Sequence, residues 1–148
     1  EYIYQQAALY FNKKRMYTKA FQWIERARNF ASFNRFSITN THAVISFNAN
    51  IDKEDDCYGS VRNLLEESLN DLIDCYTNDR RKAIHVLSFS NAAIRFYQRF
   101  KTDDAIQYLY KAKGWLEIEK DTSDCGTRMK HNMENAYSKI QRLVASDY

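Results

Sequence analysis

Two stretches of this chain, AALYFNKKRMYTKAFQWIERA at residues 7–27 and AAIRFYQRFKTDDAIQYLYKA at residues 92–112, share one spacing of small and aromatic residues. In the first stretch, apolar residues fall at helical spacing on either side of the polar turn NKKRMYT. The second stretch keeps the same register 85 residues later, around the turn QRFKTDD. Each stretch therefore predicts a hairpin of two antiparallel helices.

The composition of the whole chain supports helices throughout. Among 148 residues there is no proline and there are three glycines, so the strongest helix breakers are nearly missing. The hydrophobic fraction of 45% is that of a chain that folds. We therefore predict an all-α protein.

Charge and cysteine content limit the classes of partner and compartment. Lys and Arg total 22 against 19 for Asp and Glu, and the two signs are interspersed, so the small excess does not by itself call for a nucleic-acid partner. Three cysteines at long spacings do not form a disulfide framework and favour a reducing compartment. No apolar run approaches the ~18 residues of a membrane-spanning helix. The sequence predicts a cytoplasmic protein without a membrane segment.

A third, weaker copy of the spacing begins 34 residues after the first, at Ile38, Thr41, His42 and Ile45. Its second helix is delayed by the polar insertion NIDKEDDCYGS. A last amphipathic helix near residues 127–145 is suited to cover the open end of a stack of hairpins. The expected single domain has repeats at 1–34, at 35–81 with a loop insertion near 50–60, and at 82–120, followed by a capping helix at 127–146. About seven helices result.

The alternation of small and large residues on paired helices, with a period near 34, resembles the tetratricopeptide repeat. The positions that carry the resemblance are Tyr4, Ala8, Phe11, Ala20, Ile24 and Ala27, and again Phe89, Ala93, Phe96, Ala105, Leu109 and Ala112. The chain departs from the family because Ala replaces its usual Gly and its late Pro is absent. The resemblance implies antiparallel hairpins stacked as a solenoid.

In that family, the first helix of each hairpin lines a concave groove that holds a peptide or protein element. By carry-over, the groove positions of this chain would be Gln5, Leu9, Asn12, Lys13, Phe47, Ser90, Ile94, Tyr97 and Gln98. Gln5 and Leu9 stand where family members that clamp a C-terminal carboxylate carry Lys or Asn, which argues against that ligand. A mixed aromatic and amide surface favours recognition of a helix or loop.

No residue pattern in the chain indicates catalysis. The histidines His42, His85 and His131 have no second His or Cys at the spacing of zinc ligands, and no nucleophile or phosphate-loop motif is present. We expect no enzyme activity, no metal and no cofactor. His42 occupies a core place and is interpreted as a half-buried histidine bonded to a carbonyl.

Basic residues offer an alternative function. The clusters KKR at 13–15 and RRK at 80–82 lie at helix ends, where cations complement the helix dipole. A nucleic-acid-binding surface would require a stripe of cations interleaved with stacking tyrosines. Its candidate members are Arg95, Arg99, Lys101, Lys111 and Lys113, with Tyr97, Tyr108 and Tyr110.

A shorter resemblance concerns the stretch RFSITNTHAVISFNANI at residues 35–51, which is similar to repeat regions of bacterial STAND-type signalling and antiviral ATPases. It implies a sensor or assembly segment, with nucleotide chemistry in another domain. The chain begins inside an amphipathic pattern without Met, which suggests a fragment of a larger protein. Three functions remain open: a protein-binding module, a nucleic-acid-binding repeat, and a scaffold whose groove is filled by its own neighbouring domain and which would self-associate in isolation.

Overall fold

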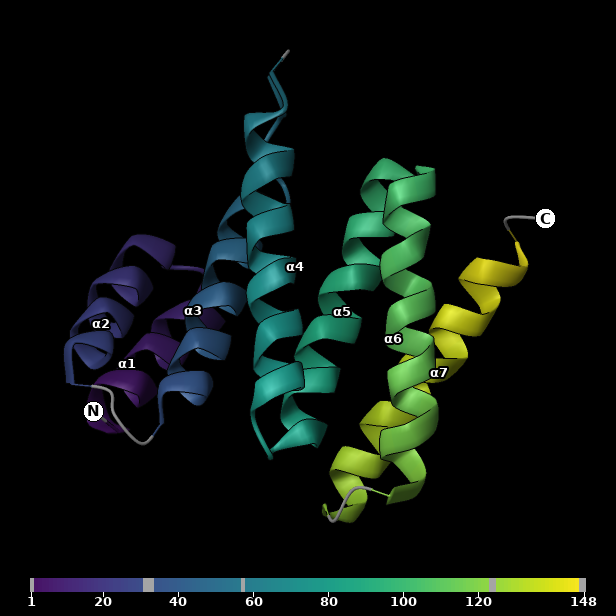
Figure 1. The fold of residues 1–148 in the computed structure, drawn as a ribbon. Helices are drawn as coiled ribbons and strands as arrows, with labels where there is room; N and C mark the ends of the chain where they lie inside the picture. Colours follow the sequence, from purple (N-terminus) through teal and green to yellow (C-terminus); the bar gives the residue numbers. More distant parts are fainter. Residues whose placement is uncertain (1, 31–33, 57, 123–124, 147–148) are drawn as a thin grey trace. The chain divides into compact units, whose positions relative to one another are not determined.

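The computed structural model describes residues 2–30, 34–56, 58–122 and 125–146, and this part of the chain is helical without any strand (Figure 1). Its seven helices are α1 Tyr2–Lys13, α2 Tyr17–Phe30, α3 Arg35–Asn50, α4 Ser60–Asn78, α5 Lys82–Phe100, α6 Asp103–Thr122 and α7 Thr127–Ala145. The prediction of an all-α chain with seven helices is confirmed. No helix in these ranges is both long and apolar enough to cross a lipid bilayer.

The chain divides into two compact units, Glu1–Thr77 and Asn78–Tyr148, which are described separately below. In unit 1, α3 contacts both helices of the α1–α2 hairpin. In unit 2, α7 contacts both helices of the α5–α6 hairpin in the same way. A hairpin followed by a helix that packs on both of its members is consistent with stacked hairpins. The solenoid and the four predicted segments of a single domain remain predictions.

The core of unit 1 consists of the small and branched residues that the sequence pattern singled out. Ala8 and Ala20 are fully buried between α1 and α2, and they belong to one cluster with Ile24, Ala27, Ile38 and Ile45. Small side chains at a helix contact allow close approach of the two backbones, and the larger side chains fill the space beside it. The aromatic residues Tyr4 and Phe11 are half-buried and pack against this cluster.

The core of unit 2 is more aromatic. Phe89 and Phe96 on α5 are fully buried, and their rings contact Tyr108 on α6 at centroid distances of 6.4 and 5.5 Å. The predicted small positions Ala93 and Ala105 are also fully buried. On α7, the buried residues are Met133, Ala136, Ile140 and Val144.

Both hairpin turns contain a cationic residue in the left-handed backbone region. Arg15 precedes α2 with φ of 59°, and Lys101 follows α5 with φ of 50°. The amide of Lys101 donates to the carbonyl of Tyr97 at 2.8 Å, and the amide of Arg15 donates to Asn12 at 3.0 Å. Left-handed residues of this kind end a helix and turn the chain back.

The predicted insertion occupies residues 51–59 and provides the cap of α4. The Asp55 carboxylate accepts the backbone N–H of Val61 at 2.9 Å, and the Asp56 carboxylate accepts that of Ser60 at 3.0 Å. Hydrogen bonds from the Ser60 backbone and hydroxyl lower the pKa of the exposed Asp56 below 3.8. Cys57 lies outside the described residues.

Candidate functional site

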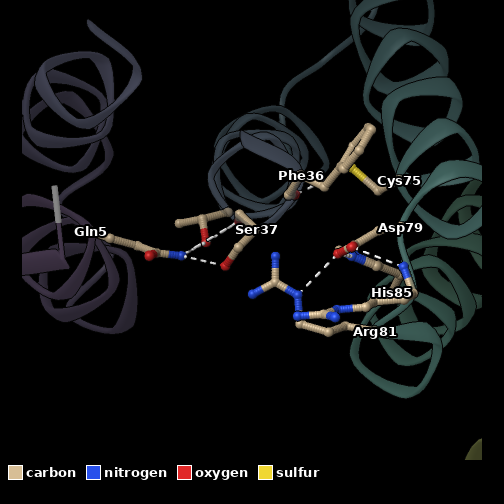
Figure 2. Close-up of polar contacts among 9 residues, drawn as sticks. Gln5, Phe36, Ser37, Cys75, Asp79, Arg81 and His85 are labelled. Carbon is tan, nitrogen blue, oxygen red and sulfur yellow. Dashed lines mark hydrogen bonds and ion pairs between the residues drawn. The ribbon is translucent and has the colours of Figure 1, made fainter. Parts of the chain in front are cut away.

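The groove positions predicted on α1 include two amides that join α1 to α3. The side-chain amide of Gln5 donates to the hydroxyls of Ser37 at 2.9 Å and Thr41 at 3.1 Å (Figure 2). Asn12 accepts a hydrogen bond from the amide of Asn48 at 3.2 Å. Gln5 and Asn12 therefore contribute to the packing of the hairpin against the next helix.

The other groove positions of unit 1 divide by exposure. Leu9 is 38% exposed and Lys13 is also exposed, so both are accessible on α1. Phe47 on α3 is buried. A side chain that is buried in this way stabilises the fold, and it contacts a partner only if the structure opens.

Most groove positions predicted on α5 are buried. Ser90, Ile94 and Tyr97 are all less than one-tenth exposed, whereas Gln98 is exposed. The Ser90 hydroxyl has no hydrogen-bond partner among the described residues. The groove remains a prediction; among its predicted positions, Leu9, Lys13 and Gln98 are exposed.

The tyrosines of the predicted nucleic-acid stripe are engaged in packing. Tyr97 is buried, and the Tyr108 ring makes edge contacts with Phe89 and Phe96. Base stacking requires an exposed ring face. Tyr97 does not offer one and Tyr108 is half-buried against these two rings, whereas Tyr110 is exposed.

The interpretation of His42 needs one correction. His42 is half-buried, as expected, but the group that faces its Nε2 is the Glu25 carboxylate at 3.1 Å rather than a backbone carbonyl. Glu25 also pairs with Arg28 at 2.9 Å. Burial is the largest influence on His42 and lowers its pKa below 6.5, with a further lowering by Arg28.

A second histidine–carboxylate contact lies at the start of α5. The Nε2 of the fully buried His85 is 2.7 Å from the Asp79 carboxylate, which also accepts from Nε of Arg81 at 3.1 Å (Figure 2). Burial lowers the pKa of His85 below 6.5, against the opposing effect of Asp79. Burial raises the pKa of Asp79, but the hydrogen bond from His85 and the Arg81 charge outweigh this and lower it below 3.8.

This contact between His85 and Asp79 was not predicted from the sequence. Its signal is an Asp three residues before the start of α5 and a His six residues after that Asp, at the fourth position of the helix. A neutral His85 donates its Nε2–H to the carboxylate and is thereby fixed in one tautomer. Because the His85 side chain is fully buried, it cannot touch an external substrate, and the contact ties the chain before α5 to the helix.

Unit 1 contains a recess at the turn between α1 and α2, close to the end of α3. We call it the turn recess; its volume is about 680 Å³, and it is lined by Arg15, Met16, Tyr17, Thr18, Lys19, Phe21, Gln22, Ala49 and Lys53. Three of these side chains are cations and none is a carboxylate. None of the predicted groove positions lines it.

Unit 2 contains a recess where the start of α5, the end of α6 and the start of α7 meet. This end recess has a volume of about 750 Å³ and is lined by Arg80, Arg81, Lys82, Ala83, Ile84, Glu119, Thr122, Cys125 and Met129. Its cations are partly offset, since Arg81 pairs with Asp79 and the buried Glu119 carboxylate forms part of the wall. Each basic cluster of the sequence thus contributes to one recess.

The described cysteines are free thiols in different settings. Cys75 is buried and its Sγ lies 3.4 Å from the carbonyl oxygen of Phe36 (Figure 2). Cys125 is half-buried at the end recess. Within the described ranges, no group of three or more His, Cys, Asp or Glu side chains is arranged to hold a metal ion.

Comparison of the chain with protein-family models, with curated proteins and with solved structures finds no significant match in any of the three.

Proposed function

We propose that this chain is a protein-interaction module and that α1 provides the surface on which a partner packs. The observation that supports this proposal is the exposure of four large apolar side chains on one twelve-residue helix. Their exposed fractions are 69% for Tyr2, 76% for Ile3, 38% for Leu9 and 57% for Tyr10.

Helical geometry places these four side chains on one face. Tyr2 and Leu9 are seven residues apart, as are Ile3 and Tyr10, and a separation of seven returns to nearly the same side of a helix. Single exposed apolar residues are ordinary on protein surfaces, but a contiguous apolar face is typical of an interaction site. The face also lies on the first helix of the first hairpin, which the tetratricopeptide resemblance assigns to partner binding.

The chemistry of this face suits a partner helix with an apolar stripe. Tyr2 and Tyr10 combine a large apolar ring with a hydroxyl that can remain in water at the rim of an interface. Such a helix would belong to another protein or to a neighbouring domain of the same polypeptide. In the setting that the STAND resemblance suggests, the module would act as the sensor region of a bacterial defence or signalling ATPase.

Nucleic acid is the weaker alternative. A nucleic acid requires exposed rings for stacking, but Tyr97 is buried and Tyr108 is half-buried against Phe96. The cations Arg99 and Lys111 lie over the rings of Phe100 and Trp115.

A photo-crosslinking amino acid at position 9 tests the proposal, with the same group at the exposed position 138 on α7 as the matched control. We expect a discrete protein adduct at position 9 that is absent at position 138 and is weakened by Tyr10→Glu, because a charge on this face opposes apolar packing. An adduct with a second copy of the chain would favour the scaffold. Identical adducts at both positions, or adducts with nucleic acid alone, would contradict the proposal.

A further inference from the structure

The turn recess combines cations from three successive parts of unit 1. Arg15 lies in the left-handed turn, Lys19 lies in the first turn of α2, and Lys53 follows α3. Arg15 and Lys19 have no carboxylate within ion-pair distance in the described ranges. Asp52 and Glu54 are next to Lys53 in sequence, but neither lines the recess. The walls therefore attract negative charge.

The end of α2 that borders the recess adds to this attraction. Its first turn contains no acidic residue. The backbone N–H groups at the start of a helix carry partial positive charge, which in many helices is offset by an acidic side chain at this position. Here a cation occupies the third helical position instead, so the helix end and the side chains favour the same sign of ligand charge.

The recess also has an apolar part. Met16 is 42% exposed, and Tyr17, Phe21 and Ala49 are half-buried along the same lining. A bare anion such as phosphate would leave these side chains uncovered. The arrangement is complementary to a ligand that carries negative charge and an apolar side chain together.

The exposure of the lining distinguishes a peptide from a small molecule. None of the nine lining residues is buried, so the recess is shallow. Small-molecule sites usually enclose most of the ligand surface, whereas a chain segment can lie across an open surface. A short polypeptide that gains affinity from several side chains therefore suits the recess better than a small ligand.

We propose that the turn recess binds an acidic peptide segment that carries an apolar side chain. Its carboxylates would pair with Arg15 and Lys19, and its apolar side chain would cover Met16 and Phe21. This proposal rests on the proposed function, because the segment would belong to the protein partner. It adds a second contact at residues outside the predicted groove.

The test uses fluorescently labelled short peptides of alternating glutamate and leucine, with fluorescence anisotropy as the readout. One control peptide replaces glutamate by glutamine, another replaces leucine by serine, and a short single-stranded oligonucleotide is the competing polyanion. We expect the glutamate–leucine peptide to bind most tightly, with an affinity that falls as salt rises. Amide NMR shifts should change at residues 15–22 and at Lys53.

Lys19→Glu is the decisive variant, because an acidic residue in the first turn of α2 favours the helix and does not disrupt the fold. Arg128→Glu in the first turn of α7 makes the same charge change on an exposed residue of unit 2. We expect Lys19→Glu to raise the dissociation constant about tenfold, mainly by slowing association, and Arg128→Glu to change it less than about twofold.

Equal binding of the glutamine peptide, equal effects of the two variants, or absence of saturable peptide binding would each overturn the inference. Tighter binding of the oligonucleotide at the same residues would replace the peptide by a nucleic acid. Failure of these peptides with an intact adduct at position 9 refutes the recess alone. Peptide binding without that adduct refutes the α1 face alone.

Discussion

The two hairpins, α1–α2 and α5–α6, place equivalent residues in different surroundings. Phe11 and Phe96 occupy the same place in the repeated spacing, yet Phe11 is half-buried and Phe96 is fully buried. The Phe96 ring contacts the Phe100 ring at 4.7 Å and Tyr108 at 5.5 Å. Phe11 is partly covered by the ammonium group of Lys19, 5.6 Å from its ring centre. Sequence spacing thus determines where a side chain points, and its neighbours determine how much water it loses.

The recesses of the two units likewise differ in the charge of the side chains around them, although the sequence near each is basic. The sequence places a basic cluster at each, but at the end recess Asp79 pairs with Arg81 and Glu119 adds a buried carboxylate. The turn recess has three cations and no carboxylate in its lining. Similar clusters of basic residues in the sequence therefore lie in recesses that present different net charge to a ligand.

The largest expected effect on stability is the difference between replacing Phe96 and replacing Phe11 by alanine. Phe96→Ala removes a fully buried ring and leaves a cavity, so we expect a loss of about 3–5 kcal/mol of unfolding free energy. Phe11→Ala removes a ring that is partly in water already, and we expect a loss of about 1–2 kcal/mol. Chemical denaturation of both variants measures the difference. Equal losses would show that position in the repeat, rather than burial, sets the cost.

The next largest effect is the pH dependence of stability that arises from the two histidine–carboxylate contacts, one in each unit. Burial lowers the pKa of both His42 and His85 below the 6.5 of an unfolded chain. As pH falls below 6.5, the unfolded chain therefore takes up these protons first, and the stability of the fold decreases. The slope is at most about 1.4 kcal/mol per pH unit for each histidine.

The measurement is unfolding free energy between pH 6.5 and pH 5.5 for the wild type, His42→Gln and His85→Gln. Each variant should flatten the slope, and the slope is informative even if the variant lowers stability at every pH. Asp79 does not contribute in this window, because its pKa is lowered below 3.8 and its stabilising effect is lost only in stronger acid. Unchanged slopes in both variants would contradict the assignment of neutral histidines.

Much of the helical framework was predictable from the sequence. Helix spacing and the absence of proline indicated seven helices, and the small residues Ala8, Ala20, Ala93 and Ala105 are buried as the pattern required. These features are local, because a period of 3.6 residues and a small side chain act within one helix or one contact.

The candidate site was less predictable, because it depends on which side chains meet. The pairing of Gln5 with Ser37 joins residues 32 positions apart, and the turn recess brings Lys53 to Arg15 and Lys19. A single sequence records the residue types but not these long-range contacts. The groove residues were carried over from a family resemblance, and side chains such as Phe47 are buried here.

The smallest expected effect concerns the cation in each hairpin turn. Arg15 and Lys101 adopt φ of 59° and 50°, which costs a side-chain-bearing residue about 1–2 kcal/mol relative to its preferred backbone. Glycine removes this strain but loses more entropy on folding, at about 0.5–1 kcal/mol. Arg15→Gly and Lys101→Gly should therefore each raise stability by less than about 1 kcal/mol, or the melting temperature by about 2 °C.

Gln107→Gly supplies the control, because Gln107 is exposed in the second turn of α6, where glycine costs up to about 1 kcal/mol. A rise in melting temperature at both turns and a fall at position 107 would show that the two hairpins reverse direction by the same left-handed residue. A rise at only one turn would mean that the other cation stabilises its hairpin through its side chain. For Arg15, that result would place the guanidinium in a fixed position at the turn recess before any ligand binds.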